Sequence, residues 1–352
     1  MNFETKLHVP FIDVTIDENN IQEGALEVLK IIRPRWKQDT IRFKLLTDGI
    51  TNKLVGCKPE DADEEETVLV RVYGNKTDLL IDREAETRNI MILNKAGLSP
   101  HLYATYRNGL AYRYVPGNTL TSETVMNPSI YELVARRLAL VHRVNVNGVS
   151  CTQPIIWDKL KDFLNLVPDS FSDNEKNMRY LKNVTHKSEI VKEANELRPI
   201  LEELNSPIVF AHNDLLLGNI IFTESKNVVT FIDYEYAAHN YQAFDIANHF
   251  AEFAGLNSIL DYSKYPNKEF QERWLRIYLN EFNGTKPSKK DIEILYVQVN
   301  KFVLLSHIFW GIWALIQAEH SYIVFDYMGY ATTRFNEYFR LKNDMLSLEL
   351  PV

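Results

Sequence analysis

Three polar residues in the middle of the chain have the types and the spacing of a metal-assisted reaction centre. Asp214 and Asn219 are five positions apart across a short loop, and Asp233 directly follows the β-branched and aromatic run of residues 228–232. Phosphoryl transfer requires a carboxylate beside the attacking hydroxyl, an amide oxygen for one Mg²⁺ and a second carboxylate that bridges metal and phosphate oxygens. The three residues therefore predict a centre for phosphoryl transfer. The structural alternative is that residues 212–214 form only a polar turn and that Asp233 is only a helix N-cap.

Short strands must position these residues. Residues 209–236 have the pattern of three short apolar strands, with polar residues concentrated where the strands end. The spacing of Asp214 and Asn219, followed by Asp233, matches the catalytic loop and the metal-binding Asp of kinase-like enzymes. His212 precedes the loop, and we expect it to support the loop.

A helix is expected directly afterwards, over residues 241–253. Asp245, His249 and Glu252 fall at positions i, i+4 and i+7 of this helix, on one stripe set among large apolar residues. A solvated face is the alternative, but the apolar setting favours partly buried polar side chains. One His and two acids on a helix brace a catalytic loop more often than they bind a metal, so we assign no metal to this stripe.

A single charge lies inside an expected strand nearer the N-terminus. Residues 67–73 are apolar around Arg71, and a buried guanidinium needs an acidic partner. The next helix, expected over residues 83–96, offers Glu86, with Glu84 as the alternative. A strand cation that bridges a helix carboxylate and nucleotide phosphates is the arrangement of kinases, here with Arg in place of Lys. A surface Arg on an edge strand is the alternative.

Two hairpins and this strand predict a small antiparallel sheet. Its five strands are expected at residues 41–47, 51–57, 67–73, 101–106 and 110–115. The first hairpin could fold over a nucleotide, with Thr51 and Asn52 near the phosphate oxygens, although any hairpin has a similar pattern. Arg113 to Val115 would present backbone groups to adenine.

The rest of the chain is predicted to be helical. Apolar residues recur at helical spacing in residues 24–32 and 130–144, and residues 155–205 form charged amphipathic helices. Residues 302–318 are nearly all apolar but fall short of the roughly 20 residues of a membrane span, so a buried helix is favoured. We expect an α+β chain with two domains. Residues 1–115 would hold the leader helix, the sheet, one helix and the nucleotide loop, and residues 116–352 would hold the catalytic loop and a substrate pocket.

Two tryptophans lie on one face of the helix expected over residues 295–318. Trp310 and Trp313 are at positions i and i+3, and Phe325 and Tyr327 follow just beyond. An indole face attracts an ammonium group by about 0.5–2 kcal/mol. The pair is therefore a candidate wall of a cation site, while core packing is the usual role of such a stripe.

Composition excludes several classes of protein. The 352 residues are 45% hydrophobic and 24% charged, as in a soluble globular chain long enough for two domains. A net charge of -8 argues against a general nucleic-acid binder. Cys57 and Cys151 indicate neither a disulfide framework nor a structural zinc, and residues 1–6 lack the pattern of a secretory signal, so we expect a cytoplasmic location.

Longer motifs resemble a known family. They are HNDLLLGNII at 212–221, IDYEY at 232–236, FDIANHF at 244–250, TDGITNKL at 47–54, YVQVNKF at 296–302 and WGIWALIQ at 310–317. These motifs closely resemble the choline/ethanolamine kinase family, and the resemblance extends over residues 40–340. It implies a protein-kinase-like two-lobed fold, with a small antiparallel sheet in the first lobe and a larger, mainly helical second lobe. It also implies an enzyme that transfers the γ-phosphate of ATP to a small amino alcohol.

The resemblance also implies residue roles. Asp214 would be the catalytic base, Asn219 and Asp233 would bind Mg²⁺, and Arg71 would hold phosphates and pair with Glu86. Thr51 and Asn52 would lie in the nucleotide loop. The positions that line the ammonium pocket in this family correspond to Tyr236, Glu252, Trp310, Trp313 and Phe325.

Two departures bear on the acceptor. Leu216 stands where choline kinases usually have Gln, and Asn257 stands near where they have a pocket Tyr. A quaternary ammonium donates no hydrogen bond and relies on an aromatic box, whereas the –NH₃⁺ of ethanolamine requires acceptors. Compared with choline kinases, this sequence lacks one aromatic pocket residue but keeps Glu252 as an acceptor, and this combination favours ethanolamine as the substrate.

The expected reaction is the phosphorylation of ethanolamine to phosphoethanolamine, the first step of the CDP-ethanolamine route to phosphatidylethanolamine. A choline kinase, or an enzyme that accepts both substrates, is the first alternative. A kinase fold acting on an aminoglycoside or a protein, and an inactive scaffold, are more remote. We expect no nucleic-acid partner and no stable insertion into a membrane, and a homodimer stays open.

Overall fold

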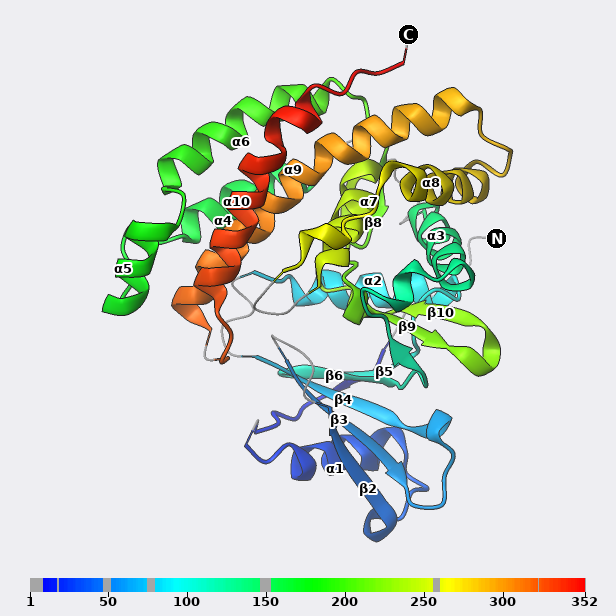
Figure 1. Ribbon diagram of the computed structural model, residues 1–352. Helices are drawn as coiled ribbons and strands as arrows, with labels where there is room; N and C mark the ends of the chain where they lie inside the picture. The colour runs from blue at the N-terminus through cyan, green and yellow to red at the C-terminus, as the bar shows by residue number, and fades with distance from the viewer. Residues whose placement is uncertain are drawn as a thin grey trace. The chain divides into compact units, whose positions relative to one another are not determined.

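The computed structural model describes residues 9–17, 19–46, 52–74, 80–145, 153–255, 260–321 and 323–351. The chain forms two compact units (Figure 1). Unit 1 comprises Met1–Asn118 and Thr223–Glu235, and unit 2 comprises Thr119–Phe222 and Tyr236–Val352. The main sheet lies in unit 1 and most helices lie in unit 2, so the expected α+β class is confirmed.

The return of Thr223–Glu235 to unit 1 differs from the expected linear division into residues 1–115 and 116–352. The reason is local. Asp233 and Glu235 form ion pairs with Arg71 of the main sheet, and the Tyr234 hydroxyl donates to the Leu98 carbonyl at 3.0 Å. These contacts hold a segment from the second half of the sequence in unit 1.

Unit 1 is built on a six-stranded sheet with the order β1-β5-β6-β4-β3-β2. Its strands are β1 (Phe11–Ile12), β2 (Ile41–Leu46), β3 (Asn52–Pro59), β4 (Val68–Tyr73), β5 (Leu102–Tyr106) and β6 (Gly109–Arg113). All neighbours are antiparallel except β1, which runs parallel to β5. The expectation of five strands was wrong by one, because two residues are too few for β1 to give an alternating pattern.

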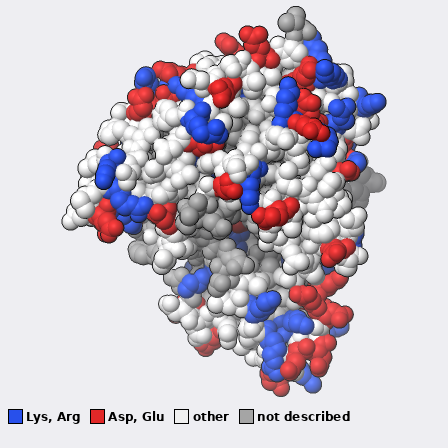
Figure 2. Space-filling model, in the orientation of Figure 1, with Lys and Arg blue, Asp and Glu red and all other residues white. Residues whose placement is uncertain are grey.

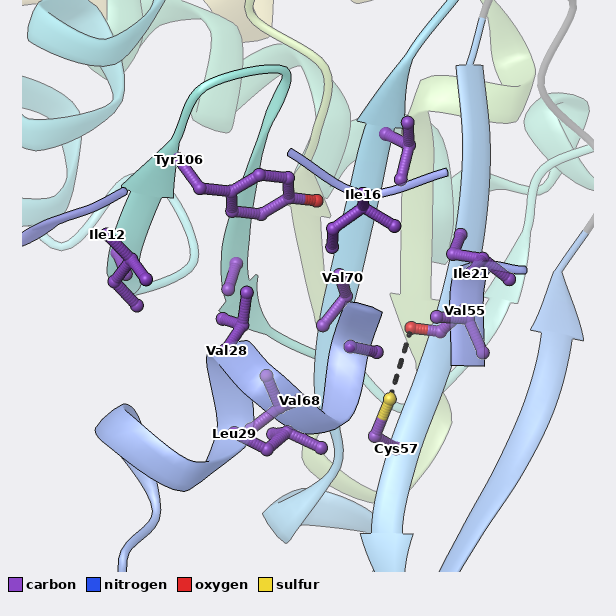
Figure 3. Close-up of a cluster of buried hydrophobic side chains, with 14 of the residues drawn as sticks. Ile12, Ile16, Ile21, Val28, Leu29, Val55, Cys57, Val68, Val70 and Tyr106 are labelled. Carbon is purple, nitrogen blue, oxygen red and sulfur yellow. Dashed lines mark hydrogen bonds between the residues drawn. The ribbon is translucent and has the colours of Figure 1, made fainter. Parts of the chain in front are cut away.

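Helix α1 (Ile21–Ile32) packs its apolar stripe against one face of this sheet (Figure 3). Val28 and Leu29 of the helix lie in the same buried cluster as Val70 of β4 and Cys57 of β3. Burial raises the pKa of the Cys57 thiol to about 12. The thiol is therefore protonated at neutral pH and acts as a small apolar group.

Helix α2 (Arg83–Lys95) begins at a defined N-cap. The Asp82 carboxylate accepts hydrogen bonds from the backbone N–H groups of Glu84 and Ala85, which satisfies two of the unpaired donors of the first turn. This start leaves Glu84 exposed and buries Glu86, whose exposed fraction is 1%. Of these two acids, Glu86 is therefore the one that faces the interior.

Unit 2 is mainly helical. Its helices are α3 (Pro128–His142), α4 (Ile156–Leu166), α5 (Asn174–Asn183), α6 (Lys187–Glu202), α7 (Gln242–Ala251), α8 (Lys268–Asn283), α9 (Lys289–His320) and α10 (Tyr327–Leu346). Strands β8 (Ile208–Ala211) and β11 (Ala238–Tyr241) pair antiparallel within it. Strands β7 (Asn118–Thr119), β9 (Ile220–Thr223) and β10 (Val228–Phe231) lie near the points where the chain passes between units. Strands β8, β9 and β10 confirm the three strands expected within residues 209–236.

Helix α9 is the central element of unit 2 and packs against α4, α6, α7, α8 and α10. Figure 1 shows it in orange, with α10 in red beside it. Among the described residues it is the one helix whose length and apolarity match a membrane span, and 94% of that stretch is buried inside the protein. The buried helix expected over residues 302–318 is therefore confirmed.

Acidic and basic side chains are interspersed on the face shown in Figure 2. The protein has exposed ion pairs such as Lys226–Glu65 at 2.8 Å and Lys264–Glu123 at 2.6 Å. Exposed ion pairs of this kind stabilise a fold by only about 0–1 kcal/mol each. The stability of both units therefore depends on their buried contacts.

Candidate active site

The loop that follows β8 carries Asp214, and Asn219 lies against it. The Asn219 amide Nδ2 donates to the Asp214 carbonyl at 2.9 Å and to the carboxylate oxygen Oδ2 at 3.4 Å. Asn213, directly before Asp214, has a left-handed backbone with a φ of 65°. Such a conformation in a residue other than Gly costs about 1–3 kcal/mol, persists only where neighbours hold it and is common at functional sites.

Helix α7 supplies the groups that hold this loop. The fully buried Asp245 accepts hydrogen bonds from the backbone N–H groups of His212 at 2.8 Å and Asn213 at 2.7 Å. The His142 ring hydrogen-bonds the same carboxylate at 2.8 Å. Burial opposes ionisation of Asp245, but the hydrogen bonds and charge from His142 hold its pKa below the usual value. Asp245 is therefore an ionised clamp on the loop.

His249, one turn further along α7, contacts the same loop at Leu215. Its Nδ1 lies 3.0 Å from the Leu215 carbonyl, so Nδ1 carries the proton because a carbonyl only accepts. Burial lowers the pKa of His249 to about 4, and the ring is neutral at pH 7. The stripe of Asp245, His249 and Glu252 is buried throughout, so its alternative as a solvated face is excluded.

His249 should make the stability of the protein depend on pH. Its pKa is about 4 when folded and about 6.5 when unfolded. The unfolded chain therefore binds a proton first as the pH falls, and the free energy of unfolding should decrease by about 3 kcal/mol between pH 6.5 and 4. His249→Gln should flatten this slope in urea unfolding, whereas His186→Gln, at an exposed position, should not. An unchanged slope in His249→Gln would contradict the assignment.

A cluster of buried ion pairs surrounds Arg71 in unit 1. The guanidinium Nη1 donates to Glu86 at 3.0 Å and to Asp233 at 2.9 Å, and Nη2 donates to Glu235. Burial disfavours the charged form of Arg71, but Asp233, Glu86 and Glu235 together raise its pKa well above the usual value. The predicted pairing with Glu86 is confirmed, and the alternative Glu84 is excluded because that side chain is exposed.

Two members of this cluster, Arg83 and Glu235, are not among the predicted site residues. Arg83 Nη1 donates to Glu86 at 2.9 Å and to Glu235 at 3.1 Å, and its guanidinium lies 3.8 Å from the centre of the Tyr73 ring. The signal for Arg83 was its position three residues before Glu86, on the same helix face. The signal for Glu235 was its position two residues after Asp233.

The three carboxylates of the cluster fit a divalent cation. Oxygens of Glu86, Asp233 and Glu235 lie within 4.8 Å of one another, and each of these carboxylates also accepts a hydrogen bond from Arg71. Asp233 is the most accessible, with 27% of its side chain exposed, and its φ is 64°. A donor set made of oxygen alone is what Mg²⁺ prefers. Asp233 also lines a pocket together with Arg71 and the apolar Ile90.

The residues expected to contact the nucleotide differ in whether the structure leaves them available to do so. Thr51 lies outside the described residues, and Asn52 begins β3 with its amide 3.5 Å from Glu235. The Arg113 N–H donates to the His101 carbonyl at 2.8 Å, so it is not available to adenine. Within the described part of the chain, the N–H and C=O of Val115 have no hydrogen-bond partner. Val115 is thus the better candidate of the predicted pair.

Aromatic side chains of unit 2 form a continuous cluster, which we call the aromatic wall. Its members are Tyr236, Trp310, Trp313, Phe325, Tyr327 and Tyr330. Trp310 lies 5.4 Å from Tyr236 and 5.6 Å from Trp313 between ring centres, and Trp313 Nε1 donates to the Tyr236 hydroxyl at 2.9 Å. The Asn213 amide Nδ2, directly before Asp214, donates to the carbonyl of Tyr236 at 3.0 Å. The wall therefore lies near the loop of Asp214.

Glu252 already has a cationic partner. Arg334 Nη1 donates to its carboxylate at 3.1 Å, and the exposed fractions of the two residues are 4% and 1%. Burial raises the pKa of Glu252, and Arg334 opposes this rise. Glu252 was expected to be an acceptor for ammonium, and its partner Arg334, a buried cation on α10, was not predicted. Asn257, the other residue of that argument, lies outside the described residues.

Comparison with known proteins decides the family. The family model described as choline/ethanolamine kinase matches residues 43–339. The chain belongs to this family. The ethanolamine kinase of Drosophila melanogaster is 45% identical over 419 residues, which cover 97% of this chain and 81% of the fly protein. Human ethanolamine kinase 1 is 44% identical over 351 residues, 97% of this chain and 77% of the human protein.

Solved structures of choline/ethanolamine kinases have the same fold. An ethanolamine kinase from Plasmodium vivax has a TM-score of 0.80 and 28% identity over 92% of this chain and 89% of the other. A choline kinase from Cryptosporidium parvum has a TM-score of 0.76 and 25% identity over 92% of this chain and 95% of the other. The expected protein-kinase-like fold is confirmed, and the chain is a small-molecule kinase.

Proposed function

We propose that this choline/ethanolamine kinase family member transfers the γ-phosphate of ATP to ethanolamine and forms phosphoethanolamine. The observation that carries the choice of ethanolamine is that relatives 44% and 45% identical over 97% of this chain are ethanolamine kinases. The aromatic wall and the buried carboxylate of Glu252, both near Asp214, are suited to an amino alcohol. The product would enter the CDP-ethanolamine route, and we place the enzyme in the cytoplasm.

In this proposal Asp214 orients the hydroxyl of ethanolamine and accepts its proton as the phosphoryl group is transferred. The clamp by Asp245 and the hydrogen bond from His249 fix the loop before substrate arrives. A positioned base of this kind contributes about 100- to 10,000-fold to the rate. The strained backbone of Asn213 is consistent with a loop held in one geometry.

Asn219 and Asp233 are the residues we assign to Mg²⁺, and Glu235 is a further oxygen donor beside Asp233. When bound, Mg²⁺ neutralises charge on the phosphates and orients them. Arg71, held by Glu86, would face the same phosphates. Arg83 shares Glu86 and Glu235 with Arg71, so each of these acids keeps one hydrogen-bond donor if Arg71 turns toward a phosphate. The backbone of Val115 is assigned to adenine, and Thr51 and Asn52 to the phosphate loop.

The ammonium end of ethanolamine is assigned to the aromatic wall. Ring faces attract a cation without requiring a hydrogen bond, and the second oxygen of Glu252 can accept one from –NH₃⁺. Arg334 opposes the rise in the pKa of Glu252 that burial causes, and its hydrogen bond fixes the orientation of the carboxylate. Choline would use the ring faces alone, so it remains the alternative acceptor.

The first experiment compares ethanolamine and choline as acceptors, each with ATP and Mg²⁺. We expect a higher kcat/KM for ethanolamine and no turnover after Mg²⁺ is removed with a chelator. A preference for choline would keep the fold and the roles of Asp214, Asn219 and Asp233 but overturn the proposed substrate. Turnover of neither would contradict the proposed function.

Trp313 gives a separate test of the ammonium site. Trp313→Ala should raise the KM for ethanolamine about 2- to 30-fold, the equivalent of a cation–π contact of 0.5–2 kcal/mol, and change the KM for ATP little. Trp157 on α4 is a matched control, because both tryptophans lie in unit 2 and each is 8% exposed. Trp157→Ala should leave the ratio of the two KM values unchanged. Equal effects of Trp313→Ala on the KM values for ethanolamine and ATP would mean that Trp313 only packs in the core.

A further inference from the structure

One buried amide joins the loop of Asp214 to the aromatic wall. Asn248 on α7 is fully buried, and its Nδ2 donates to the Asn213 carbonyl at 3.3 Å. Its Oδ1 accepts hydrogen bonds from Trp310 Nε1 at 2.6 Å and from the Ser306 hydroxyl at 2.8 Å. Because an indole N–H only donates, Trp310 fixes which end of the amide faces the wall. The other end must then face the loop.

The same network reaches Glu252. The Ser306 hydroxyl accepts a hydrogen bond from Arg334 Nη2 at 3.3 Å, and Arg334 Nη1 donates to Glu252. Asn248, Ser306, Arg334 and Glu252 are each at most 4% exposed and all belong to unit 2. Both sides of the ammonium site, Trp310 and Glu252, are therefore connected to the residue before Asp214 through Asn248.

We propose that Asn248 is a positioning residue that sets the separation between Asp214 and the ammonium site, and so selects amino alcohols by chain length. The inference depends on the proposed function and extends it. The hydroxyl end of the substrate is held by the loop after β8, and the ammonium end by α9. With this separation fixed, a two-carbon acceptor reaches both ends, whereas a third carbon must displace one of them.

Only an amide can make all these contacts, since the site requires a donor toward Asn213 and an acceptor toward Trp310 and Ser306. Asn248→Asp keeps the size and the acceptor. It places a carboxylate oxygen against the Asn213 carbonyl, where two acceptors repel each other. The loop would then lose its connection to the wall, and the separation would become variable.

The experiment measures kcat/KM for ethanolamine and for 3-amino-1-propanol and compares their ratio between variants. One methylene is worth about 10- to 200-fold in a well-fitted site, so we expect Asn248→Asp to reduce the preference for ethanolamine about 5- to 10-fold. A smaller folded fraction would lower both values equally. A new negative charge would also act on both substrates equally, because both carry the same ammonium group. A change in the ratio of the two kcat/KM values therefore indicates a change in the separation between Asp214 and the ammonium site.

Asn300 provides a matched control. It is 1% exposed, lies on α9 and donates hydrogen bonds to Gln271 at 2.7 Å and to the Tyr296 carbonyl at 2.8 Å. Asn300→Asp introduces the same change away from the loop and should leave the ratio unchanged. If Asn248→Asp does not fold, Ser306→Ala decides, since it removes one donor to Asn248 and the connection to Arg334. A lower ratio in this variant supports the proposal.

The proposal is overturned if kcat/KM falls equally for both acceptors in Asn248→Asp, or if the ratio is unchanged in Ser306→Ala where that variant decides. Either result would mean that Asn248 merely supports the fold. Failure of the proposed function is distinguishable, because the wild-type protein would then phosphorylate neither acceptor.

Discussion

Asp214→Asn is expected to lower kcat for ethanolamine by about 100- to 10,000-fold, the contribution of a positioned general base. Asn has the same shape but cannot accept the proton of the hydroxyl. The loop should survive, because its backbone is held by Asp245 and by the bond from Asn219 to the carbonyl of residue 214. Nucleotide binding should therefore be retained.

The test of Asp214 combines turnover at saturating substrates with calorimetric binding of a non-hydrolysable ATP analogue and Mg²⁺. Asp158→Asn, at an exposed position of α4, removes the same charge away from the loop and should leave both measurements unchanged. Near-normal turnover in Asp214→Asn would exclude this carboxylate as the base. Loss of nucleotide binding together with turnover would contradict a purely catalytic role.

Arg71→Met should lower the free energy of unfolding by about 3–5 kcal/mol, because removing one partner leaves the others as unpaired buried charges. Glu86 and Glu235 have side chains that are 0% and 3% exposed, so water cannot replace the guanidinium. Arg83 alone cannot satisfy them and Asp233 as well. Affinity for the nucleotide should fall in the same variant, because Arg71 is assigned to the phosphates.

Arg107→Met is the matched control for this effect. Arg107 also pairs with an acid, Asp13, at 2.5 Å, but the two side chains are 60% and 69% exposed. Breaking an exposed pair should cost about 0–1 kcal/mol in the same urea titration.

Arg71→Lys separates charge from geometry, since Lys keeps the charge but cannot donate to three acids in one plane. Equal destabilisation by Arg71→Met and Arg107→Met would show that burial of the cluster does not matter.

The parts of the fold and site that could be predicted depend on short stretches of sequence. The strand that contains Arg71 is a short apolar run, the helix that begins at Arg83 follows it directly in the next stretch of sequence, and the structure has both at the expected places. Asp214 and Asn219 were recognisable because one loop carries both. Strand β1 was missed because its two residues give no pattern of their own.

Partners distant in sequence could not be predicted. Arg71 and Glu235 are 164 positions apart, and Glu252 and Arg334 are 82 positions apart. No periodicity connects residues at such separations, because only the packing of several elements brings them together. The difference from the prediction is most important at Glu252. This residue was expected to be an acceptor for the substrate, but it already forms an ion pair with Arg334.

The passage of Thr223–Glu235 through unit 1 has a consequence for how the protein is made. When a ribosome has produced Met1–Asn118, the sheet of unit 1 still lacks Asp233 and Glu235, more than a hundred residues further along. At about 5–20 residues per second this delay lasts roughly 5–25 s. During that time the positive charge of Arg71 has only Glu86 as a partner within the cluster, and the nascent unit is incomplete. Unit 1 therefore cannot complete its buried ion-pair cluster until Glu235 has been synthesised.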